Sequence, residues 1–386
     1  MKFRILAALA VSSLAAFGLA ALDIDSFDIP IARFAATGGA HAALADDWTV
    51  LFSNPAGLAD VAPQLVAAQF GAKVTGPLFD IALAALGGGS LTDPTALTNN
   101  FVKVLADNGY QLYTAGDFVG PLSFGYVGDG IGFGLFNRSH VVVDAASVTN
   151  IGILAQEDIL LVGGYSYGMD LGPSHRIEAG LLAKGFARGG ISTTTDALSL
   201  ATIVQNVTAQ PFELETGIGM DLGVRWIWKP TGLSAGIVCR DIYSPVLVNN
   251  YSSVQGFMSN PQASSLGSVT GDVPRNLDVG VAWSMLPGGL WNLVDSLSVA
   301  MDFGHILELW QPFSPNPILD LGIGVETRFL DIVSLRAGIS EGYPSAGASL
   351  DLSVMKLDLA VWGSELGLEP GSRPAFNLMT GLEFTY

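Results

Sequence analysis

The chain has one cysteine, Cys239, among its 386 residues, so an internal disulfide is excluded. Basic residues are also scarce, because 17 Lys and Arg stand against 35 Asp and Glu and give a formal net charge of −18. Such a charge argues against nucleic acid as a partner. The four histidines show no metal-ligand spacing, and we expect neither a metal nor another cofactor.

Long apolar runs are missing as well. After the first 21 residues no apolar run reaches the ~18 residues of a membrane-spanning helix, so we expect none. Yet 49% of the residues are hydrophobic, 13% are charged, and the mean hydropathy is +0.45. Because a backbone in hydrocarbon must pair its polar groups internally, a transmembrane β-barrel is the membrane structure that remains.

Residues 1–21 have the three parts of a secretory signal peptide. Lys2 and Arg4 precede an apolar stretch, and Gly18 and Ala20 put small residues where a signal peptidase cuts. The apolar stretch could instead anchor the chain in a membrane, but acidic residues follow it. We expect cleavage, and export without disulfides fits a bacterial envelope protein.

Apolar and polar residues alternate along many segments, which is typical of β-strands with two different faces. In LETGIGMDLGVRWIW, residues 214–228, one parity is apolar and the other is mostly Gly, Asp, Glu and Arg. A membrane barrel needs an apolar outer face, whereas a soluble β-sandwich reverses the burial. The export signal and the composition favour the barrel, as do tryptophans expected at the membrane interfaces: Trp226, Trp228, Trp283 and Trp362.

We predict an all-β fold, a transmembrane antiparallel β-barrel of about 14 strands with both ends in the periplasm. The strands are expected near 64–75, 110–126, 130–145, 157–170, 175–188, 211–229, 232–245, 274–287, 295–306, 316–329, 332–341, 345–353, 355–364 and 374–386. Short periplasmic turns are expected at 128–130, 172–175 and 229–232, and long outer connections at 76–109, 189–210, 246–273 and 365–373.

The first long connection, 76–109, contains two short amphipathic segments that predict helices. Ile81 and Ala85 belong to the first segment, and Phe101 and Leu105 belong to the second. Their apolar faces either offer a landing surface for a hydrophobic solute or pack on the barrel rim.

Parity places many charged residues on the inner face, where they are expected to pair with one another. A second interpretation is that one or two inward bases bind the carboxylate of a fatty acid. Arg225 comes first for this role because Trp226 and Trp228 follow it in the chain. The candidates are Arg225, Arg240, Arg336 and Lys184.

The sequence GYSYG, residues 164–168, fits a hydrolase motif but lies in an alternating strand, without the strand–turn–helix elbow that the motif needs. We therefore expect Ser166 to be a lumen residue and the protein not to be an enzyme.

The chain ends in FNLMTGLEFTY, in which one parity holds Phe376, Leu378, Leu382, Phe384 and Tyr386. A last strand with terminal aromatic residues resembles the signal that outer-membrane barrels present to their insertion machinery. We expect Phe384 and Tyr386 to serve that contact and the outward face to contact outer-membrane lipid. The alternative is the last strand of a soluble sheet.

The segment GGAHAALADDWTVLFSNPAGLADV, residues 38–61, resembles the N-terminal hatch of the FadL family of outer-membrane transporters for long-chain fatty acids and other hydrophobic compounds. PorV-type barrels and several spirochaete outer-membrane proteins are similar. The matching positions are Gly38, Gly39, Asp46, Asp47, Asn54, Pro55 and Ala56.

This resemblance implies a hatch at 22–62 inside a monomeric barrel formed by 63–386, in the outer membrane of a bacterium. It implies passive diffusion of long-chain fatty acids or other hydrophobic small molecules, with a hatch that moves and a lateral exit between strands. The alternative is a PorV-like scaffold or a surface antigen without transport. An apolar pocket above the hatch would favour transport.

The residues of the segment also predict local structure. The run 40–47 favours a short helix, and Asp47 is expected to cap the turn that begins at Trp48. Pro55 restricts Asn54 to an extended or turn conformation. The Asn54 side chain is then free to bond nearby backbone groups and to anchor the segment on the barrel wall.

Overall fold

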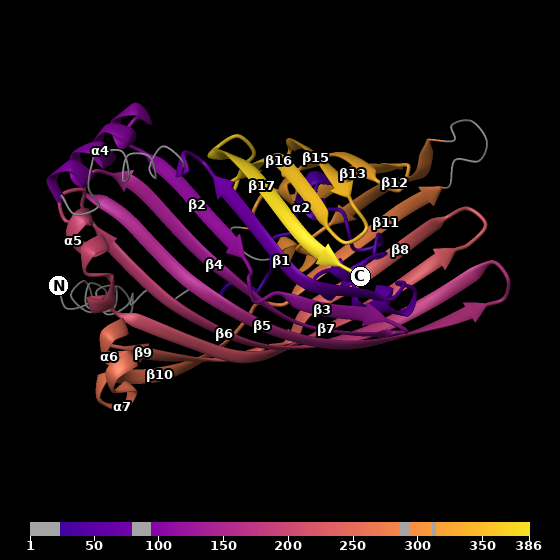
Figure 1. Ribbon diagram of the computed structural model, residues 1–386, viewed down its shortest axis with the longest axis horizontal. Coiled ribbons are helices and arrows are strands. Elements are labelled where there is room, and N and C mark those ends of the chain that lie inside the picture. Colours follow the sequence, from indigo (N-terminus) through magenta and orange to yellow (C-terminus); the bar gives the residue numbers. More distant parts are fainter. Residues whose placement is uncertain (1–23, 79–93, 286–292, 311–313) are drawn as a thin grey trace, which may run out of the picture.

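The computed structural model shows one closed antiparallel β-barrel with a segment of chain inside it (Figure 1). The expected signal peptide, 1–21, and nearly all of the first amphipathic segment of the loop 76–109 lie outside the described residues. Those residues are 24–78, 94–285, 293–310 and 314–386.

The described residues contain seventeen strands in a single sheet. They are β1 (Gln64–Thr75), β2 (Leu112–Val119), β3 (Phe124–Gly128), β4 (Ile131–Ser147), β5 (Asn150–Leu171), β6 (His175–Thr195), β7 (Phe212–Trp228), β8 (Leu233–Tyr243), β9 (Pro245–Tyr251), β10 (Ser265–Asp272), β11 (Asn276–Met285), β12 (Val294–Phe303), β13 (Leu321–Phe329), β14 (Val333–Ser340), β15 (Tyr343–Asp351), β16 (Lys356–Glu365) and β17 (Pro374–Thr385). Three pairs, β2 with β3, β8 with β9 and β10 with β11, are single wall strands interrupted by a few residues. The barrel therefore has fourteen wall strands, as predicted, and closes where β1 pairs with β17.

Two of the predicted long connections are partly strand. Strand β6 continues to Thr195, and the expected loop 246–273 contains most of β9 and all of β10. The β10 sequence, SLGSVTGD, lacks a clear apolar parity because nearly all of its residues are exposed. Alternation marks a strand only where one of its faces is buried or lies in lipid.

The wall is much taller on one side than on the other. Strands β4 to β7 have 17 to 22 residues, whereas β12 to β16 have 8 to 10. Since about 9–11 residues cross a membrane, the tall strands continue beyond it. Four helices lie at that end, opposite the short turns (Figure 1): α4 (Pro94–Asp107), α5 (Leu200–Gln205), α6 (Val254–Ser259) and α7 (Pro261–Ser264). By the usual asymmetry of such barrels, the helical end is extracellular.

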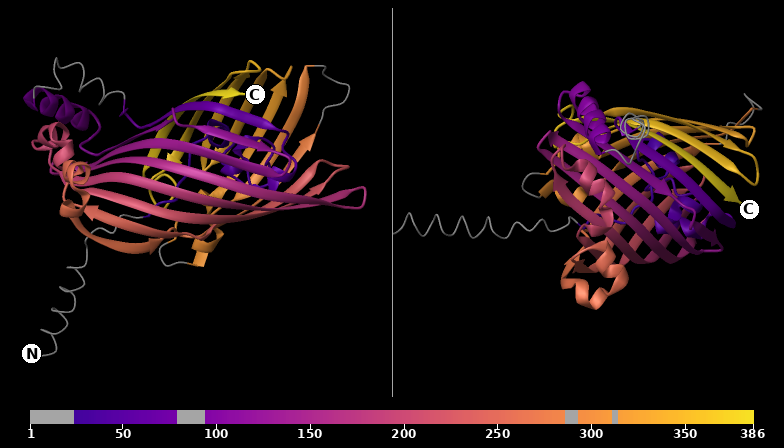
Figure 2. Two further views of the ribbon diagram at one scale, coloured as in Figure 1. Left: turned by 60° about the horizontal axis from the view of Figure 1, so that its bottom comes forward. Right: turned by 60° about the vertical axis from the view of Figure 1, so that its left-hand side comes forward.

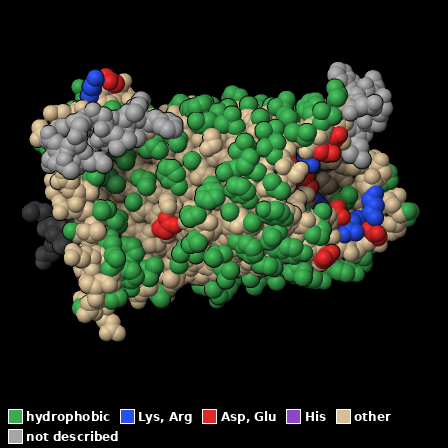
Figure 3. All heavy atoms as spheres, viewed as in Figure 1, with side chains coloured by type: hydrophobic (Ala, Val, Ile, Leu, Met, Phe, Trp, Pro, Cys, Tyr) green, Lys and Arg blue, Asp and Glu red, His purple; other side chains and the backbone are tan. Residues whose placement is uncertain are grey.

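Apolar side chains cover the outer face of the wall (Figure 3). Large exposed hydrophobic residues share the outward parity, among them Phe133, Leu161, Ile218, Val325 and Leu359. Trp228 and Trp283 also point outward, and Trp283 Nε1 donates to the Thr231 carbonyl in a short turn at 2.9 Å. The interfacial position predicted for Trp362 is wrong, because this residue has the inward parity of Asp358 and packs beside helix α2 (Ala32–Ala36).

The second half of the loop 76–109 is helical, as predicted. On α4, Phe101 and Leu105 are buried against Leu112, Ala145 and Ile151 of the neighbouring strands. These apolar residues therefore pack on the barrel rim, which is the second of the two roles expected for them. None of the helices in the described ranges is long and apolar enough to cross a membrane.

Residues 24–63, called the N-terminal segment below, lie inside the ring of strands (indigo in Figure 2). The segment contains α2, the 3-10 helix η1 (Trp48–Leu51) and the 3-10 helix η2 (Pro55–Ala59). Trp48, Leu51 and Leu58 pack against the inward side chains Phe136 and Leu182 in the main hydrophobic cluster. The core of the molecule is thus the contact between this segment and the tall side of the wall.

Candidate functional site

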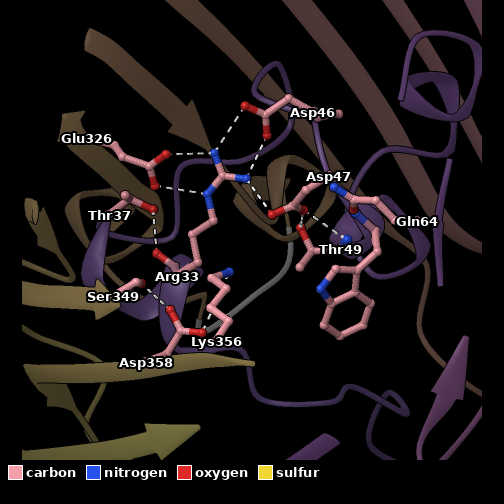
Figure 4. A network of polar contacts seen from close by, with 12 residues as sticks. Arg33, Thr37, Asp46, Asp47, Thr49, Gln64, Glu326, Ser349, Lys356 and Asp358 are labelled. Carbon is pink, nitrogen blue, oxygen red and sulfur yellow. Dashed lines mark hydrogen bonds and ion pairs between the residues drawn. The ribbon is translucent and has the colours of Figure 1, made fainter. Parts of the chain in front are cut away.

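Arg33 on α2 is the polar centre of the N-terminal segment (Figure 4). Its guanidinium lies 2.6 Å from Asp46 and 2.8 Å from Asp47, both in the same segment. It also lies 2.9 Å from Glu326 of β13. The Arg33 side chain is only 7% exposed, so these ionic hydrogen bonds replace the water that it loses. Arg33 therefore folds the segment onto itself and ties it to the wall.

The wall extends this network across three further strands (Figure 4). Glu326 also accepts from Arg336 of β14, which lies 3.3 Å from Asp358 of β16. Ser349 of β15 bridges Arg336 and Asp358, and Lys356 lies 3.6 Å from the same Asp358. The N-terminal segment is thus bonded to wall residues that also form ion pairs with one another.

Asp47 caps the turn that follows it, as predicted. Its Oδ1 accepts from the Thr49 backbone N–H at 2.9 Å, at the start of η1. The next residue, Trp48, donates from Nε1 to Glu383 of β17 at 3.2 Å. The acidic pair Asp46 and Asp47 therefore neutralises Arg33 and begins a turn.

The helix predicted at 40–47 is wrong, because barrel side chains bond the backbone groups that a helix would use. The Ala42 N–H donates to Asp302 of β12 at 2.6 Å. The Ala45 carbonyl accepts from Arg225 of β7 at 2.5 Å. An extended run of small residues leaves these groups open to the wall, so the backbone is paired without a helix.

Asn54 is fully buried, and its side chain bonds nearby backbone groups, as predicted. It has an extended backbone, with φ −107° and ψ 110°, before Pro55. Its Oδ1 accepts from the Ala56 N–H at 3.0 Å, and its Nδ2 donates to the Ala42 carbonyl at 2.8 Å. Its Nδ2 also lies 3.3 Å from the Val224 carbonyl of β7, in the wall. The amide therefore satisfies both a donor and an acceptor of the buried chain.

A row of glycines on β6, β7 and β8 receives this turn. A Cβ added at Gly223 would lie 2.0 Å from Asn54 Oδ1, and one at Gly180 would lie 2.3 Å from the Pro55 carbonyl oxygen. At Gly236 it would lie 2.1 Å from the Ala42 carbonyl oxygen. Glycine permits this approach of two backbones. The inward glycines of 214–228 thus leave room for the backbone of Asn54-Pro55-Ala56 against the wall.

Gly38 and Gly39 end helix α2 with positive φ angles of +65° and +79°. At Gly38 a Cβ would also lie 2.5 Å from the Ile339 carbonyl oxygen of β14. Both the left-handed backbone and the close approach require glycine at this position. The pair turns the segment sharply against the low side of the wall.

Each of the four bases proposed as fatty-acid ligands has a carboxylate partner within the barrel. Lys184 lies 2.8 Å from both Asp221 and Asp241. Arg225 lies 2.8 Å from Glu178, Arg336 pairs with Glu326 and Asp358, and Arg240 pairs with Asp278. Internal pairing is therefore the role that the contacts display, and binding of a ligand carboxylate stays a prediction. Of the four, Arg240 lines the cavity described next.

A cavity of about 730 Å³ lies between the N-terminal segment and the low side of the wall. Gly38, Gly39 and His41 form part of its inner side, and Asp278 and Asp302 belong to its outer side. Burial and the Arg240 guanidinium lower the pKa of His41 to about 4, so its imidazole is neutral. The cavity is rich in carboxylates, unlike the apolar pocket that we expected of a transporter.

The cavity lies where the wall is interrupted. Strand β12 ends at Phe303, which is paired with Val279, and β10 is paired only with β9 in the described part of the chain. Two 3-10 helices follow β12, namely η4 (Ile306–Trp310) and η5 (Pro317–Asp320). Residues of both line the cavity. The cavity therefore opens beside the rim formed by the ends of the short strands.

Arg33 is the functional residue that sequence reasoning missed. It is the single Lys or Arg between residues 24 and 63, a stretch that contains five aspartates. A lone base among carboxylates in a buried segment is a signal for an ion-pair centre. Ser166, by contrast, lies where predicted, and its hydroxyl donates to the Ala56 carbonyl at 2.8 Å.

Comparison with known proteins gave matches in structure alone. No protein-family profile matches the chain, and no curated protein matches it. Similar solved structures are the CymD monoaromatic hydrocarbon channel (12% identity, 92% of this chain and 96% of that one, TM-score 0.44), the Ralstonia pickettii toluene transporter TbuX (12%, 94% and 98%, 0.45) and a Pseudomonas aeruginosa FadL homologue (13%, 93% and 99%, 0.44). All three TM-scores lie below 0.5 and the identities are low, so these likenesses decide neither a family nor a cargo.

A closed antiparallel barrel with an apolar outer belt can pair all its backbone groups in lipid. The chain is an outer-membrane β-barrel. Within its described residues, no group of three or more His, Cys, Asp or Glu side chains is placed to hold a metal ion.

Proposed function

We propose that this barrel lets hydrophobic small molecules cross the outer membrane by passive diffusion, as a monomer, with residues 22–62 acting as a hatch. The observation that carries the proposal is the anchored filling of the lumen. The segment packs on the tall wall through Trp48, Leu51 and Leu58 and is bonded to the low wall through Arg33. A barrel filled in this way is not an open aqueous pore.

The interrupted rim supplies the proposed route past the hatch. Above Phe303 the described strands leave the edge of β10 unpaired, and the cavity lies behind this edge. A solute that enters the cavity can leave toward the membrane there without breaking the Arg33 network. A hydrophobic solute gains free energy on that path, because it moves from water into lipid.

Long-chain fatty acids remain one candidate cargo within this proposal. Their carboxylate needs a basic partner, and the bases Arg225, Arg336 and Lys184 are engaged by acids of the wall. At these three positions a fatty acid would therefore have to displace an internal ion pair. Neutral hydrophobic solutes need no such exchange.

The test uses the purified full-length mature barrel in lipid vesicles. We expect saturable uptake of a labelled neutral alcohol, dodecanol, above the rate in protein-free vesicles. In planar bilayers the same protein should give little ion conductance, and a variant lacking residues 22–56 should conduct strongly because the lumen is emptied.

Folding of both proteins is checked by the heat-induced shift in gel mobility that closed barrels show. If the folded wild type takes up neither dodecanol nor other hydrophobic probes, the transport proposal is wrong and a scaffold or antigen role replaces it. High conductance of the wild type would instead indicate an unselective porin.

A further inference from the structure

The cavity at the low rim has a strong excess of negative charge. Eight carboxylates line it, against two guanidinium groups. They come from both sides, so the excess belongs to the cavity as a whole. The carboxylates are Asp25, Asp28, Asp241, Asp278, Asp302, Glu308, Asp320 and Glu341, and the guanidinium groups are Arg240 and Arg275.

The two guanidinium groups do not cancel this excess. Arg240 is paired with Asp278, so one base and one acid neutralise each other. Arg275 is exposed in the break between β10 and β11, at the edge of the cavity. The imidazole of His41 is neutral and stacks on Phe34 at a ring distance of 4.1 Å. Two further acids of the lining have a basic partner, because Asp241 lies 2.8 Å from Lys184 and Asp320 lies 3.1 Å from His305. The acids outside these pairs still outnumber Arg275 on the cavity lining.

Asp302 shows that this polar surface is not complete by itself. Asp302 is only 7% exposed, and its Oδ2 accepts hydrogen bonds from the backbone N–H groups of His41 and Ala42. Its Oδ1 is buried with no hydrogen-bond partner among the described residues. A Cβ added at Gly280 of β11 would lie 2.0 Å from this oxygen, so Oδ1 lies over the wall backbone beside the cavity. Asn276 Oδ1, another acceptor on the cavity wall, is also without a partner there.

Apolar side chains share the cavity with these acids. Ile24 comes from the N-terminal segment, and Val273 and Pro274 come from the break after β10. Leu319 comes from η5, and Leu321 is the first residue of β13. Such a lining fits a molecule with an apolar body and a polar end. The polar end must supply hydrogen-bond donors, because the lining is rich in acceptors.

We propose that this cavity selects hydrophobic amines and other apolar molecules with a cationic or donor head group, and that it disfavours carboxylates. The proposal rests on the transport function above and names its cargo class. A cationic head is attracted by the acids of the cavity lining. A carboxylate of the same chain length meets like charges on both sides of the cavity.

The size of the effect follows from the electrostatics of clefts. Walls of one charge sign and low polarisability concentrate counter-ions by about tenfold or more. Salt weakens this attraction between exposed charges over a distance of about 8–10 Å at ~0.1–0.15 M ionic strength. The selectivity should therefore be largest at low salt.

The experiment compares three solutes that differ only in their heads: dodecylamine, dodecanol and dodecanoate. Initial uptake into vesicles of neutral lipid that contain the full mature barrel is measured at pH 7 and low salt, with protein-free vesicles as the background. We expect protein-dependent uptake of the amine to exceed that of dodecanoate about tenfold or more, with the alcohol between them.

A double variant tests the assignment to this cavity. Asp28→Asn with Glu308→Gln removes one carboxylate from the N-terminal segment and one from η4, and neither is part of the Arg33 network. We expect the amine-to-carboxylate ratio to fall several-fold. The matched control, Asp107→Asn with Asp129→Asn, removes the same charge at exposed positions outside the cavity lining and should keep the ratio.

The outcomes separate the two proposals. Uptake of dodecanol with equal uptake of amine and carboxylate would overturn the charge selectivity and leave the transport function standing. A loss of ratio in the control variant that matches the loss in the cavity variant would assign the effect to net charge and reject the cavity. Absence of uptake for all three solutes would reject the transport function itself.

Discussion

Arg33 and Glu326 lie 293 positions apart in the chain, yet their side chains meet inside the barrel in a two-pronged ion pair. Arg33 Nε lies 2.9 Å from Glu326 Oε2, and Nη2 lies 3.0 Å from Oε1. The pair joins α2 of the N-terminal segment to β13 of the wall. It forms only when the segment has entered the barrel, so it reports the plugged state directly.

Removing Arg33 should loosen the N-terminal segment. Arg33→Ala leaves Glu326 and Asp47 buried without their shared partner, which typically costs about 3–5 kcal/mol. We expect faster hydrogen exchange over residues 31–47 in the otherwise intact barrel. The control is Arg373→Ala, because Arg373 and Asp144 form a pair that is 45% and 40% exposed. Such a pair contributes about 0–1 kcal/mol, and an equal response of both variants would contradict the role given to Arg33.

The Asn54 amide should not tolerate an isosteric acid. Asn54→Asp replaces the Nδ2 donor by an oxygen facing the Ala42 carbonyl, at a cost of about 1–3 kcal/mol or more. The free energy of unfolding in urea, measured in micelles, should fall by that amount. Asn108→Asp, just after α4, removes a donor bond of the same 2.8 Å length, to the Val104 carbonyl, at an exposed position. It should change stability by a few tenths of that value, and a similar loss in both would reject the anchor.

Glycine at position 223 should be required by the turn that it receives. In Gly223→Ala the new Cβ would lie 2.0 Å from Asn54 Oδ1, so the turn must move off the wall. We expect raised ion conductance in planar bilayers as the filling loosens. Gly185→Ala on β6 is the matched change, since nothing lies within 4 Å of its added Cβ. Unaltered conductance in Gly223→Ala would show that this contact adapts.

A charged substitution on the outward face should be destabilising within the membrane and tolerated on the extracellular extension of the wall. Ile323→Arg places a charge on the outward face of a short strand, where about 2–4 kcal/mol is expected near the membrane midplane. Val148→Arg lies in the turn between β4 and β5, on the extracellular extension. The two wild-type residues are 40% and 37% exposed, so they differ mainly in depth. Folding yield in vesicles should drop for Ile323→Arg alone, and equal yields would contradict the assigned belt.

The last residue should matter for assembly more than for the folded barrel. Tyr386 is 70% exposed, and its backbone N–H and carbonyl bond Leu65 at 2.9 and 2.8 Å. Tyr386→Ala keeps these bonds, so refolding into detergent should be unchanged. Insertion into the outer membrane of living cells should fall if the terminal aromatic is recognised there. Tyr243→Ala, another exposed outward aromatic, is the control, and equal insertion of both variants would remove the proposed recognition.

The alternation of apolar and polar residues was sufficient to predict a barrel of fourteen strands, because period 2 assigns each side chain to lipid or lumen. It failed on β10, whose faces are nearly all exposed, and on Trp362, whose place near a strand end hid its inward parity. The turn at Asn54 was predictable because Pro55 and the Asn side chain act locally. These are properties that neighbouring residues impose on one another.

The tertiary structure alone decided what those inward groups do. Sequence placed Arg225, Arg240, Arg336 and Lys184 in the lumen, but their carboxylate partners lie on neighbouring strands whose register only the folded barrel fixes. The run 40–47 favours a helix by itself, and it is not helical because Asp302 and Arg225 bond its backbone. The acid-rich cavity exists because a low wall, an interrupted strand and the N-terminal segment meet there. Local propensities do not predict such contacts, because the contacts join groups that are far apart in the chain.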